Sequence, residues 1–319
     1  MSKSISWGVI GCGSVTRKSF LPALQQVPQT HLTAIASRSK EKAIEFTQDF
    51  EGEPIEGYNN LLRRKDIDAV YIATPVAEHA KVAIEAARQG KHILCEKSIA
   101  QDLKTTETIV QVCKENNVAL LEGFSYQFHS QHVKVRNLLQ DGIIGEVVLF
   151  KSSFGFPPLN KNNIRYKKKL GGGSLFDAGC YTVHAARHFF ESEPIRVMAV
   201  LNSKGYEVDI SGSVFLDFDN GKSAQLAFGF NNFYCNEQIF WGSTGRITLK
   251  RAFSPHATLE PKLILEKPGI YKIISLEACN QFAEEIQVFC RGLESKQQQV
   301  QWSEDVLNQS RVLELIRLS

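Results

Sequence analysis

Short apolar runs alternate with longer amphipathic stretches through the first third of the chain. The runs are rich in β-branched residues and each is followed by a break, which is typical of strands joined by helical crossovers in a parallel sheet. The pattern therefore predicts a doubly wound parallel α/β sheet. Its expected strands cover residues 6–10, 31–36, 69–73, 92–95 and 118–121.

The pattern changes after residue 123. Asn220-Gly221 separates two alternating apolar runs, which is a strong signal for a β-hairpin. We therefore expect a Rossmann-type domain over residues 1–123 and an α+β domain with a large, mostly antiparallel open sheet over residues 124–319. In this second domain we expect helices at about 124–140, 174–190, 276–292 and 304–318, and a strand at 146–153.

Composition narrows the class of protein. The chain has 319 residues, and its formal charge of +3 is nearly balanced, so no nucleic-acid partner is expected. Seven cysteines without a Cys-x-x-Cys pair indicate reduced thiols, and hence a cytoplasmic location. The opening segment, with Lys3 as its one basic residue, is too short for a signal-peptide core, and no later run is long enough for a membrane span.

A glycine-containing turn follows the first expected strand. The run Gly11-Cys12-Gly13-Ser14-Val15 places two glycines where the backbone must turn tightly and approach a pyrophosphate. Thr16 stands at the third glycine position of this fingerprint, so the bare motif is degraded. Its place between the first strand and the first helix still favours dinucleotide binding by these five residues.

The end of the second expected strand favours NADP over NAD. An Asp or Glu that binds the adenosine ribose would repel a 2′-phosphate, and none stands here. Ser37 and Arg38 could instead donate charge-assisted hydrogen bonds to that phosphate. The alternative is that Arg38 and Lys40 form only a solvated, basic start to the next helix.

Further candidate residues follow the next two strands, where ligands of open α/β sheets bind. Thr74 and Pro75 come directly after the strand at 69–73, with His79 nearby. Glu96 and Lys97 end the strand at 92–95. We expect all five to contact the cofactor.

These motifs occur in an order that resembles the Gfo/Idh/MocA oxidoreductase family, which includes enzymes of the glucose-fructose oxidoreductase and inositol dehydrogenase type. The resemblance rests on Gly-x-Gly, Ala-Ser-Arg, Ala-Thr-Pro, Glu-Lys and the run Gly171-Gly172-Gly173-Ser-Leu-Phe-Asp-Ala-Gly-Cys-Tyr181, across nearly the whole chain. It implies hydride transfer between nicotinamide and a carbinol or ketone carbon of a polyol, sugar, sugar nucleotide, inositol-like compound or cyclic diol. It also implies a homo-oligomer, a dimer or tetramer, assembled through the open sheet.

The resemblance further implies three catalytic residues. Lys97 matches the family's active-site lysine, whose ammonium can hold the reacting oxygen. Tyr181 matches the usual His or Tyr, and its phenol could exchange a proton with the substrate if Lys97 draws its pKa toward neutrality. Asp177 would orient Lys97 or a substrate hydroxyl. Tyr181 and Asp177 could alternatively cap and pack a helix.

The chain departs from the family pattern at several positions. Ser98 replaces the proline that usually follows the lysine, and Gln127 replaces an arginine in the stretch 122–130. These departures keep open a non-catalytic NAD(P)-binding sensor on the same scaffold. His184 and His188 lack a third ligand in the sequence, so no metal is expected. The basic residues Lys161, Arg165 and 167–169 could supply the positive charge that is missing at Gln127, but we expect them to form a solvated loop.

Overall fold

The computed structural model describes residues 4–319, so Lys3 of the opening segment lies outside the described residues. The chain forms two compact units. The first runs to Phe124 and includes Phe282–Ser310, and the second comprises Ser125–Gln281 and Arg311–Ser319. The expected single boundary at residue 123 does not anticipate that Phe282–Ser310 belongs with the first unit.

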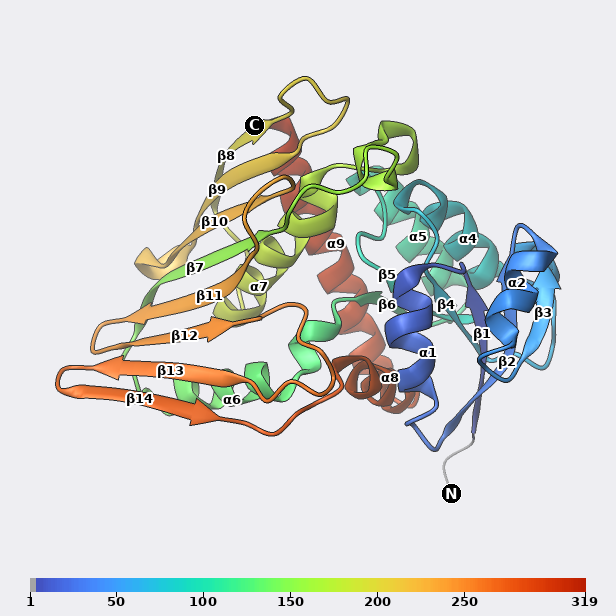
Figure 1. Ribbon diagram of the computed structural model, residues 1–319, viewed down its shortest axis with the longest axis horizontal. Coiled ribbons are helices and arrows are strands. Elements are labelled where there is room, and N and C mark those ends of the chain that lie inside the picture. Colours follow the sequence, from blue (N-terminus) through green and yellow to red (C-terminus); the bar gives the residue numbers. More distant parts are fainter. Residues whose placement is uncertain (1–3) are drawn as a thin grey trace. The chain divides into compact units, whose positions relative to one another are not determined.

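The first unit contains a six-stranded, fully parallel sheet in the order β3-β2-β1-β4-β5-β6 (Figure 1). The strand order reverses between β1 and β4, which is the switch point where such sheets bind ligands. The strand prediction is confirmed except for β3, a polar edge strand. The strands are β1 Ile5–Ile10, β2 Thr30–Ser37, β3 Glu53–Glu56, β4 Ala69–Ile72, β5 His92–Glu96 and β6 Leu120–Gly123.

Helices connect these strands. Ser39 caps α2 by accepting a hydrogen bond from the Lys42 amide, and Asp102 caps α5 in the same way from Thr105, which satisfies amides that have no partner within the helix. The elements are η1 Thr16–Phe20, α1 Leu21–Leu24, α2 Lys40–Thr47, α3 Tyr58–Leu62, α4 Val76–Arg88, α5 Leu103–Glu115, α8 Gln281–Gly292 and α9 Lys296–Leu318. Helix α9 continues beyond Ser310 into the residues of the second unit.

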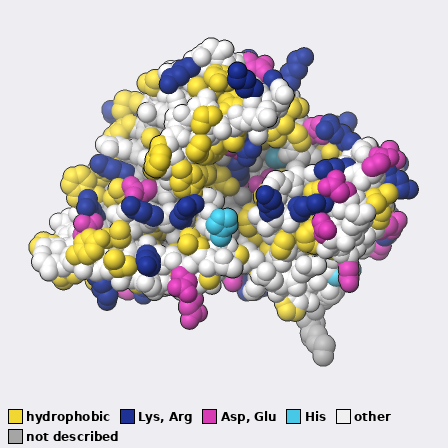
Figure 2. All heavy atoms as spheres, viewed as in Figure 1, with side chains coloured by type: hydrophobic (Ala, Val, Ile, Leu, Met, Phe, Trp, Pro, Cys, Tyr) yellow, Lys and Arg dark blue, Asp and Glu magenta, His cyan; other side chains and the backbone are white. Residues whose placement is uncertain are grey.

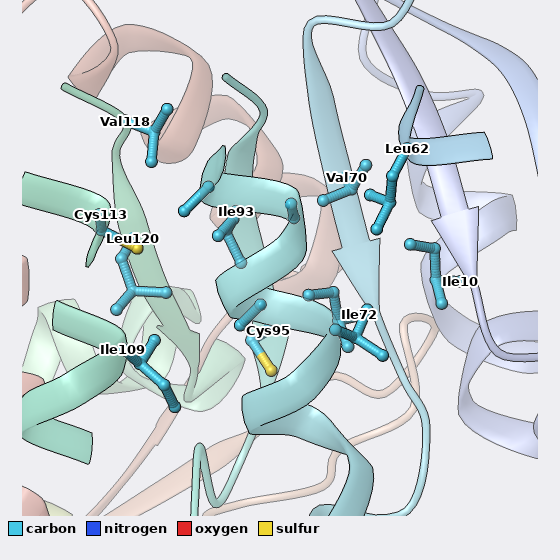
Figure 3. Close-up of a cluster of buried hydrophobic side chains, with 14 of the residues drawn as sticks. Ile10, Leu62, Val70, Ile72, Ile93, Cys95, Ile109, Cys113, Val118 and Leu120 are labelled. Carbon is cyan, nitrogen blue, oxygen red and sulfur yellow. The ribbon is translucent and has the colours of Figure 1, made fainter. Parts of the chain in front are cut away.

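Two apolar layers hold the parallel sheet. One packs strand residues such as Ile72, Ile93 and Leu120 against Ile109 of α5 and its neighbours (Figure 3). The other contains large aromatic residues: Tyr71 stacks on Phe20 with ring centroids 3.6 Å apart. Because both layers are fully buried, the carboxyl ends of the strands are held in fixed positions.

The second unit contains an eight-stranded sheet in the order β14-β13-β12-β11-β7-β10-β9-β8. All neighbours are antiparallel except β7 and β10, as the sequence predicted for a mostly antiparallel sheet. The strands are β7 Val147–Gly155, β8 Arg196–Asn202, β9 Ser211–Asp217, β10 Ser223–Gly229, β11 Cys235–Gly242, β12 Arg246–Lys250, β13 Lys262–Lys267 and β14 Ile270–Ser275.

The predicted hairpin is present between β9 and β10. Asn220 and Gly221 have φ of 64° and 72°, the left-handed conformation that this residue pair adopts readily. The expected helix at 124–140 is divided instead, because the His129 side chain accepts a hydrogen bond from the Gln131 amide and caps a new helix there. The helical elements are η2 Ser125–Phe128, α6 Ser130–Gln140, η3 Ile164–Tyr166, η4 Lys168–Leu170, η5 Leu175–Gly179, η6 Asp219–Gly221 and α7 Cys180–Phe190.

Helix α7 packs on one face of this sheet, against β7 and β10 (Figure 1). Gly179, just before α7, allows the close approach, because a Cβ there would lie 2.8 Å from the Phe228 ring of β10. Residues that follow the glycine run are thereby fixed to the sheet.

Charges of both signs are interspersed on the face shown in Figure 2, in line with the small net charge. All seven cysteines are free thiols. Within residues 4–319, no helix has the length and apolar character needed to cross a membrane.

Candidate active site

The turn after β1 requires its first glycine. Gly11 has φ of +108°, and a Cβ there would lie 2.5 Å from the Ala73 carbonyl oxygen. A Cβ on Gly13 would meet only that same oxygen, at 4.0 Å. The backbone conformation and the nearby Ala73 carbonyl therefore require glycine at position 11. Gly13 instead leaves room beside the turn for a ligand to approach the backbone.

Thr16 stabilises this turn, although it departs from the glycine fingerprint at the third position. Its side chain is fully buried, and Oγ1 donates a hydrogen bond of 2.8 Å to the Gly11 carbonyl. The Arg17 amide donates to the Gly13 carbonyl at 3.2 Å. A side-chain hydrogen bond thus stabilises the turn where the fingerprint usually has a third small residue.

Ser37 and Arg38 lie at the end of β2. Ser37 is buried and hydrogen-bonds the Cys12 thiol, while burial raises the pKa of that thiol to about 11, so Cys12 is protonated at neutral pH. The Arg38 side chain is 71% exposed and pairs with Glu78 of α4, its Nη1 3.1 Å from Oε1. Sequence reasoning did not anticipate this pair, because Glu78 is forty residues away along the chain.

Residues 74–79 follow β4. The Thr74 hydroxyl is buried and has no hydrogen-bond partner among the described residues. His79 is buried, and its Nδ1 and Nε2 lie 2.9 Å and 2.7 Å from the carbonyl oxygens of Ser98 and Thr74. Burial lowers the pKa of His79, while the two carbonyl contacts oppose that shift. His79 thus braces the backbone after β4 and β5; its direct contact with the cofactor stays a prediction, as does contact through Pro75.

Glu96 and Lys97 end β5. The Glu96 carboxylate accepts a hydrogen bond of 2.5 Å from Tyr71 Oη, which fixes it toward the aromatic layer of the first unit. The Lys97–Ser98 peptide bond is cis. The buried Glu122 carboxylate accepts from the Ile99 amide at 2.8 Å. Lys97 therefore lies between two anchored residues, Glu96 and Ile99. The sequence did not indicate that Glu122 would anchor the second of them.

The second unit holds the other two predicted catalytic residues. Asp177 of η5 accepts a hydrogen bond of 2.6 Å from Nε of Arg165, and its carboxylate raises the pKa of that arginine. Arg165 lies in the lysine-rich segment that was expected to be a solvated loop, so that expectation is wrong for this residue. Orientation of Lys97 or a substrate hydroxyl by Asp177 stays a prediction.

Tyr181, four residues after Asp177, lies among aromatic rings. The ring centroids of Phe154 and Phe253 are each 5.4 Å from that of Tyr181, and the Tyr126 centroid is 5.9 Å away. Tyr181 is half-buried. These contacts restrict the orientation of the Tyr181 ring.

The two histidines considered as metal ligands, His184 and His188, have contacts with other side chains, and Tyr126 provides one of them. Its Oη lies 2.6 Å from Nδ1 of His184, whose ring stacks on that of His188 at 5.6 Å. Among residues 4–319, no cluster of three or more His, Cys, Asp or Glu side chains could hold a metal ion. His184 is thus part of a side-chain hydrogen bond that anchors α7.

Comparison with known proteins agrees with this arrangement. The model for an oxidoreductase family with an NAD-binding Rossmann fold, GFO_IDH_MocA, matches residues 5–124, and the GFO/IDH/MocA C-terminal domain matches residues 132–248. A dTDP-3,4-didehydro-2,6-dideoxy-alpha-D-glucose 3-reductase of Actinomadura kijaniata is 40% identical over 311 residues, covering 97% of this chain and 94% of the relative.

Two more relatives bear on the cofactor. A crystal structure of a 3-ketoreductase from Actinomadura kijaniata in complex with NADP and TDP-benzene has a TM-score of 0.94 at 39% identity, covering 99% of this chain and 98% of that one. D-xylose 1-dehydrogenase (NADP(+)) 2 of Haloferax volcanii is 30% identical over 293 residues, 91% of this chain and 89% of the relative. On the matches to both domains and the similarity along nearly its whole length, this chain belongs to the Gfo/Idh/MocA family of oxidoreductases.

Proposed function

We propose that this protein, an NADP-dependent oxidoreductase of CH–OH and keto carbons, reduces the keto group of a sugar carried on a nucleoside diphosphate. The observation that carries the chemistry is the placement of Asp177 and Tyr181 four residues apart, with the half-buried Tyr181 ring packed among aromatic side chains. The similarity to a dTDP-sugar 3-reductase supports the substrate class.

The first unit fits a dinucleotide. We assign the pyrophosphate to the turn Gly11-Cys12-Gly13-Ser14-Val15, where Gly13 leaves space beside the backbone. The buried Thr74 hydroxyl, which has no partner among the described residues, fits a hydrogen bond to the bound cofactor. Ser37 and Arg38 would hold the 2′-phosphate.

The bound cofactor supplies the hydride, and side chains of this protein bind the reacting oxygen and donate the proton. Lys97, on a backbone anchored by Glu96 and Glu122, would hold the carbonyl oxygen as negative charge develops on it. Tyr181 would donate the proton that converts this oxygen into a hydroxyl. Asp177 would orient a substrate hydroxyl beside it.

A purified sample tests this proposal directly. We expect loss of NADPH absorbance with a dTDP-linked 3-keto hexose, and a much slower rate with the corresponding free sugar or with NADH. Tyr181→Phe should lower kcat by about 100-fold or more because it removes general acid catalysis, and Lys97→Ala by a similar factor because it removes a donor to the developing oxyanion. Both variants should retain NADPH affinity within about twofold.

Two matched controls accompany these variants. Lys104→Ala and Tyr206→Phe alter an exposed lysine and an exposed tyrosine, and both should keep the parent rate. Failure of every nucleotide-linked keto sugar would reject the substrate class. Nucleotide binding without turnover of any keto sugar or diol would instead favour the sensor, which the named reductases and dehydrogenases among the relatives do not favour.

We also propose a cytoplasmic homo-oligomer, with the sheet of the second unit as the contact between copies. Met198 and Val200 of β8 and Trp241 of β11 are 48%, 71% and 52% exposed, an unusual exposure for large apolar side chains on one sheet. Light scattering should give the mass of a dimer or tetramer, and Val200→Glu should lower it. A monomer at micromolar concentration would reject this part.

A further inference from the structure

The Tyr126 side chain of η2 contacts the helix α7 at two positions. Its Oη forms a hydrogen bond of 2.6 Å with Nδ1 of His184. Its ring meets the Tyr181 ring edge to face, with the two centroids 5.9 Å apart. Because residues three apart lie on the same face of a helix, Tyr181 and His184 are neighbours along the face that Tyr126 covers. Tyr126 therefore packs on the proposed proton donor and is bonded to the helix that carries it.

The hydrogen bond between Tyr126 and His184 is shielded from water. Both side chains are buried, Tyr126 completely. Deleting the Tyr126 hydroxyl would take this partner away from a histidine nitrogen that bulk water does not reach, so the bond is costly to lose. The orientation of the Tyr126 ring is thus fixed by a specific bond in addition to its packing.

Phe253, which follows β12, joins the two tyrosines. Its ring centroid lies 5.1 Å from that of Tyr126 and 5.4 Å from that of Tyr181. Its backbone amide donates a hydrogen bond of 2.9 Å to Oδ1 of Asn236, which fixes the segment that carries the ring. The His132 ring of α6 meets Tyr126 edge to face at 4.9 Å. Tyr126 is therefore packed from three directions along the chain and has little freedom to rotate.

A proton donor depends on such neighbours for its geometry. The donated proton must come within hydrogen-bonding reach of the substrate oxygen, and a misplacement of about 1 Å can cost roughly 100-fold in rate. Tyr181 is only half-buried, so its ring has neighbours over part of its surface. The direction of its hydroxyl therefore depends on the rings that do pack against it.

We propose that Tyr126 is a positioning residue for the reaction: through its bond to His184, its ring holds Tyr181 in the orientation that presents the hydroxyl to the substrate oxygen. This inference rests on the proposed function and adds to it a residue that exchanges no proton with the substrate. Tyr126 acts on the rate through Tyr181 alone. Substrate and cofactor affinities are independent of it.

The first experiment measures kcat and KM with NADPH and the keto-sugar nucleotide. Tyr126→Phe keeps the ring and deletes the hydroxyl, so it should lower kcat about tenfold, while KM and NADPH affinity stay within about twofold of the parent. The matched control is Tyr166→Phe. Tyr166 is another buried tyrosine of the second unit, and its Oη donates a hydrogen bond of 2.8 Å to Asn231. This control loses the same type of bond and should keep the parent kcat.

A double substitution tests whether Tyr126 acts through Tyr181. If it does, Tyr126→Phe should slow the Tyr181→Phe variant by less than about twofold, because the group that it positions is already absent. A further tenfold loss in the double variant would overturn the proposal. A rise in KM with unchanged kcat in Tyr126→Phe would overturn it as well, because it would show a role in binding.

Substitution of His184 removes the same hydrogen bond from the other side. His184→Leu should lower kcat as Tyr126→Phe does, whereas His184→Asn, whose amide can take the place of Nδ1, should retain most of the parent rate. Should Tyr126→Phe not fold, this pair still decides the matter. Equal rates in His184→Leu and His184→Asn would contradict the proposal.

The second experiment observes Tyr181 in the full chain without substrate. The protein is labelled with 3-fluorotyrosine, and the fluorine resonance of Tyr181 is assigned from its absence in Tyr181→Phe. Both Tyr126→Phe and His184→Leu should move this resonance toward that of free 3-fluorotyrosine, because the ring is less restrained, and Tyr166→Phe should leave it in place. An unmoved resonance in both variants would overturn the proposal. These spectra need no turnover, so an absence of keto reduction would reject the proposed function and leave the role of Tyr126 to be judged by the spectra.

Discussion

Arg38→Ala tests whether the end of β2 recognises the 2′-phosphate of NADP. A hydrogen bond to a charged group contributes about 1.5–3 kcal/mol when desolvated, and an exposed ion pair about 0–1 kcal/mol. The Arg38 side chain is 71% exposed and shared with Glu78, while Ser37 beside it is buried and would remain. We therefore expect a loss of about 1.4 kcal/mol, a tenfold weaker affinity for NADPH.

The assay is a titration of cofactor-free protein with NADPH and with NADH, followed by nicotinamide fluorescence. Affinity for NADH should change by less than about twofold, because NADH lacks the 2′-phosphate, and the NADPH effect should shrink as salt is added. Lys40→Ala is the matched control, an exposed cation two residues away. Glu78→Gln should tighten NADPH binding a few-fold by releasing Arg38 from its partner.

Two outcomes would refute this reasoning. If NADPH and NADH weaken equally, Arg38 acts on the fold of the turn and not on the phosphate. If Arg38→Ala and Lys40→Ala behave alike, both residues belong to a solvated helix start. In either case the preference for NADP would have to arise elsewhere in the first unit.

Two further predictions concern stability. Gly11→Ala should destabilise the protein by about 1–3 kcal/mol in chemical denaturation, because of its positive φ and the close Ala73 carbonyl, whereas Gly13→Ala should keep the stability and weaken only cofactor binding. Glu285 of α8 is fully buried, and burial followed by the charge of Glu96 raises its pKa well above the usual range. The native state therefore keeps the proton that the unfolded chain loses above its ordinary pKa, so stability falls as pH rises, and Glu285→Gln should raise Tm at about pH 8 with little effect below about pH 4.5. A constant difference in Tm at all pH values would contradict this assignment.

Much of the fold could be predicted because its signals are local. The parallel strands are apolar runs with clear breaks, and the hairpin at Asn220-Gly221 follows from the conformations that these two residues tolerate. The failures also have local causes. Strand β3, Glu-Pro-Ile-Glu, is polar because it lies at the edge of the sheet, and the break at His129 depends on one side-chain cap.

In the candidate site, too, some features follow from the local sequence and others only from the tertiary structure. The sequence by itself determined which residues end the strands, and thus placed Gly11, Ser37, Thr74 and Lys97 at the ligand-binding edge of a parallel sheet. The charge partners depend on the tertiary structure. Arg38 meets Glu78 only because β2 and α4 are brought to the same edge, and Arg165 meets Asp177 only because three glycines let the loop fold back.

The return of residues 282–310 to the first unit is likewise a tertiary result, and it buries Glu285 in the region of Glu96. Strand propensity and turn chemistry act over a few residues, so a linear pattern records them. A pKa or an ion pair depends on distance and desolvation in space, which are set only when segments remote in sequence pack together.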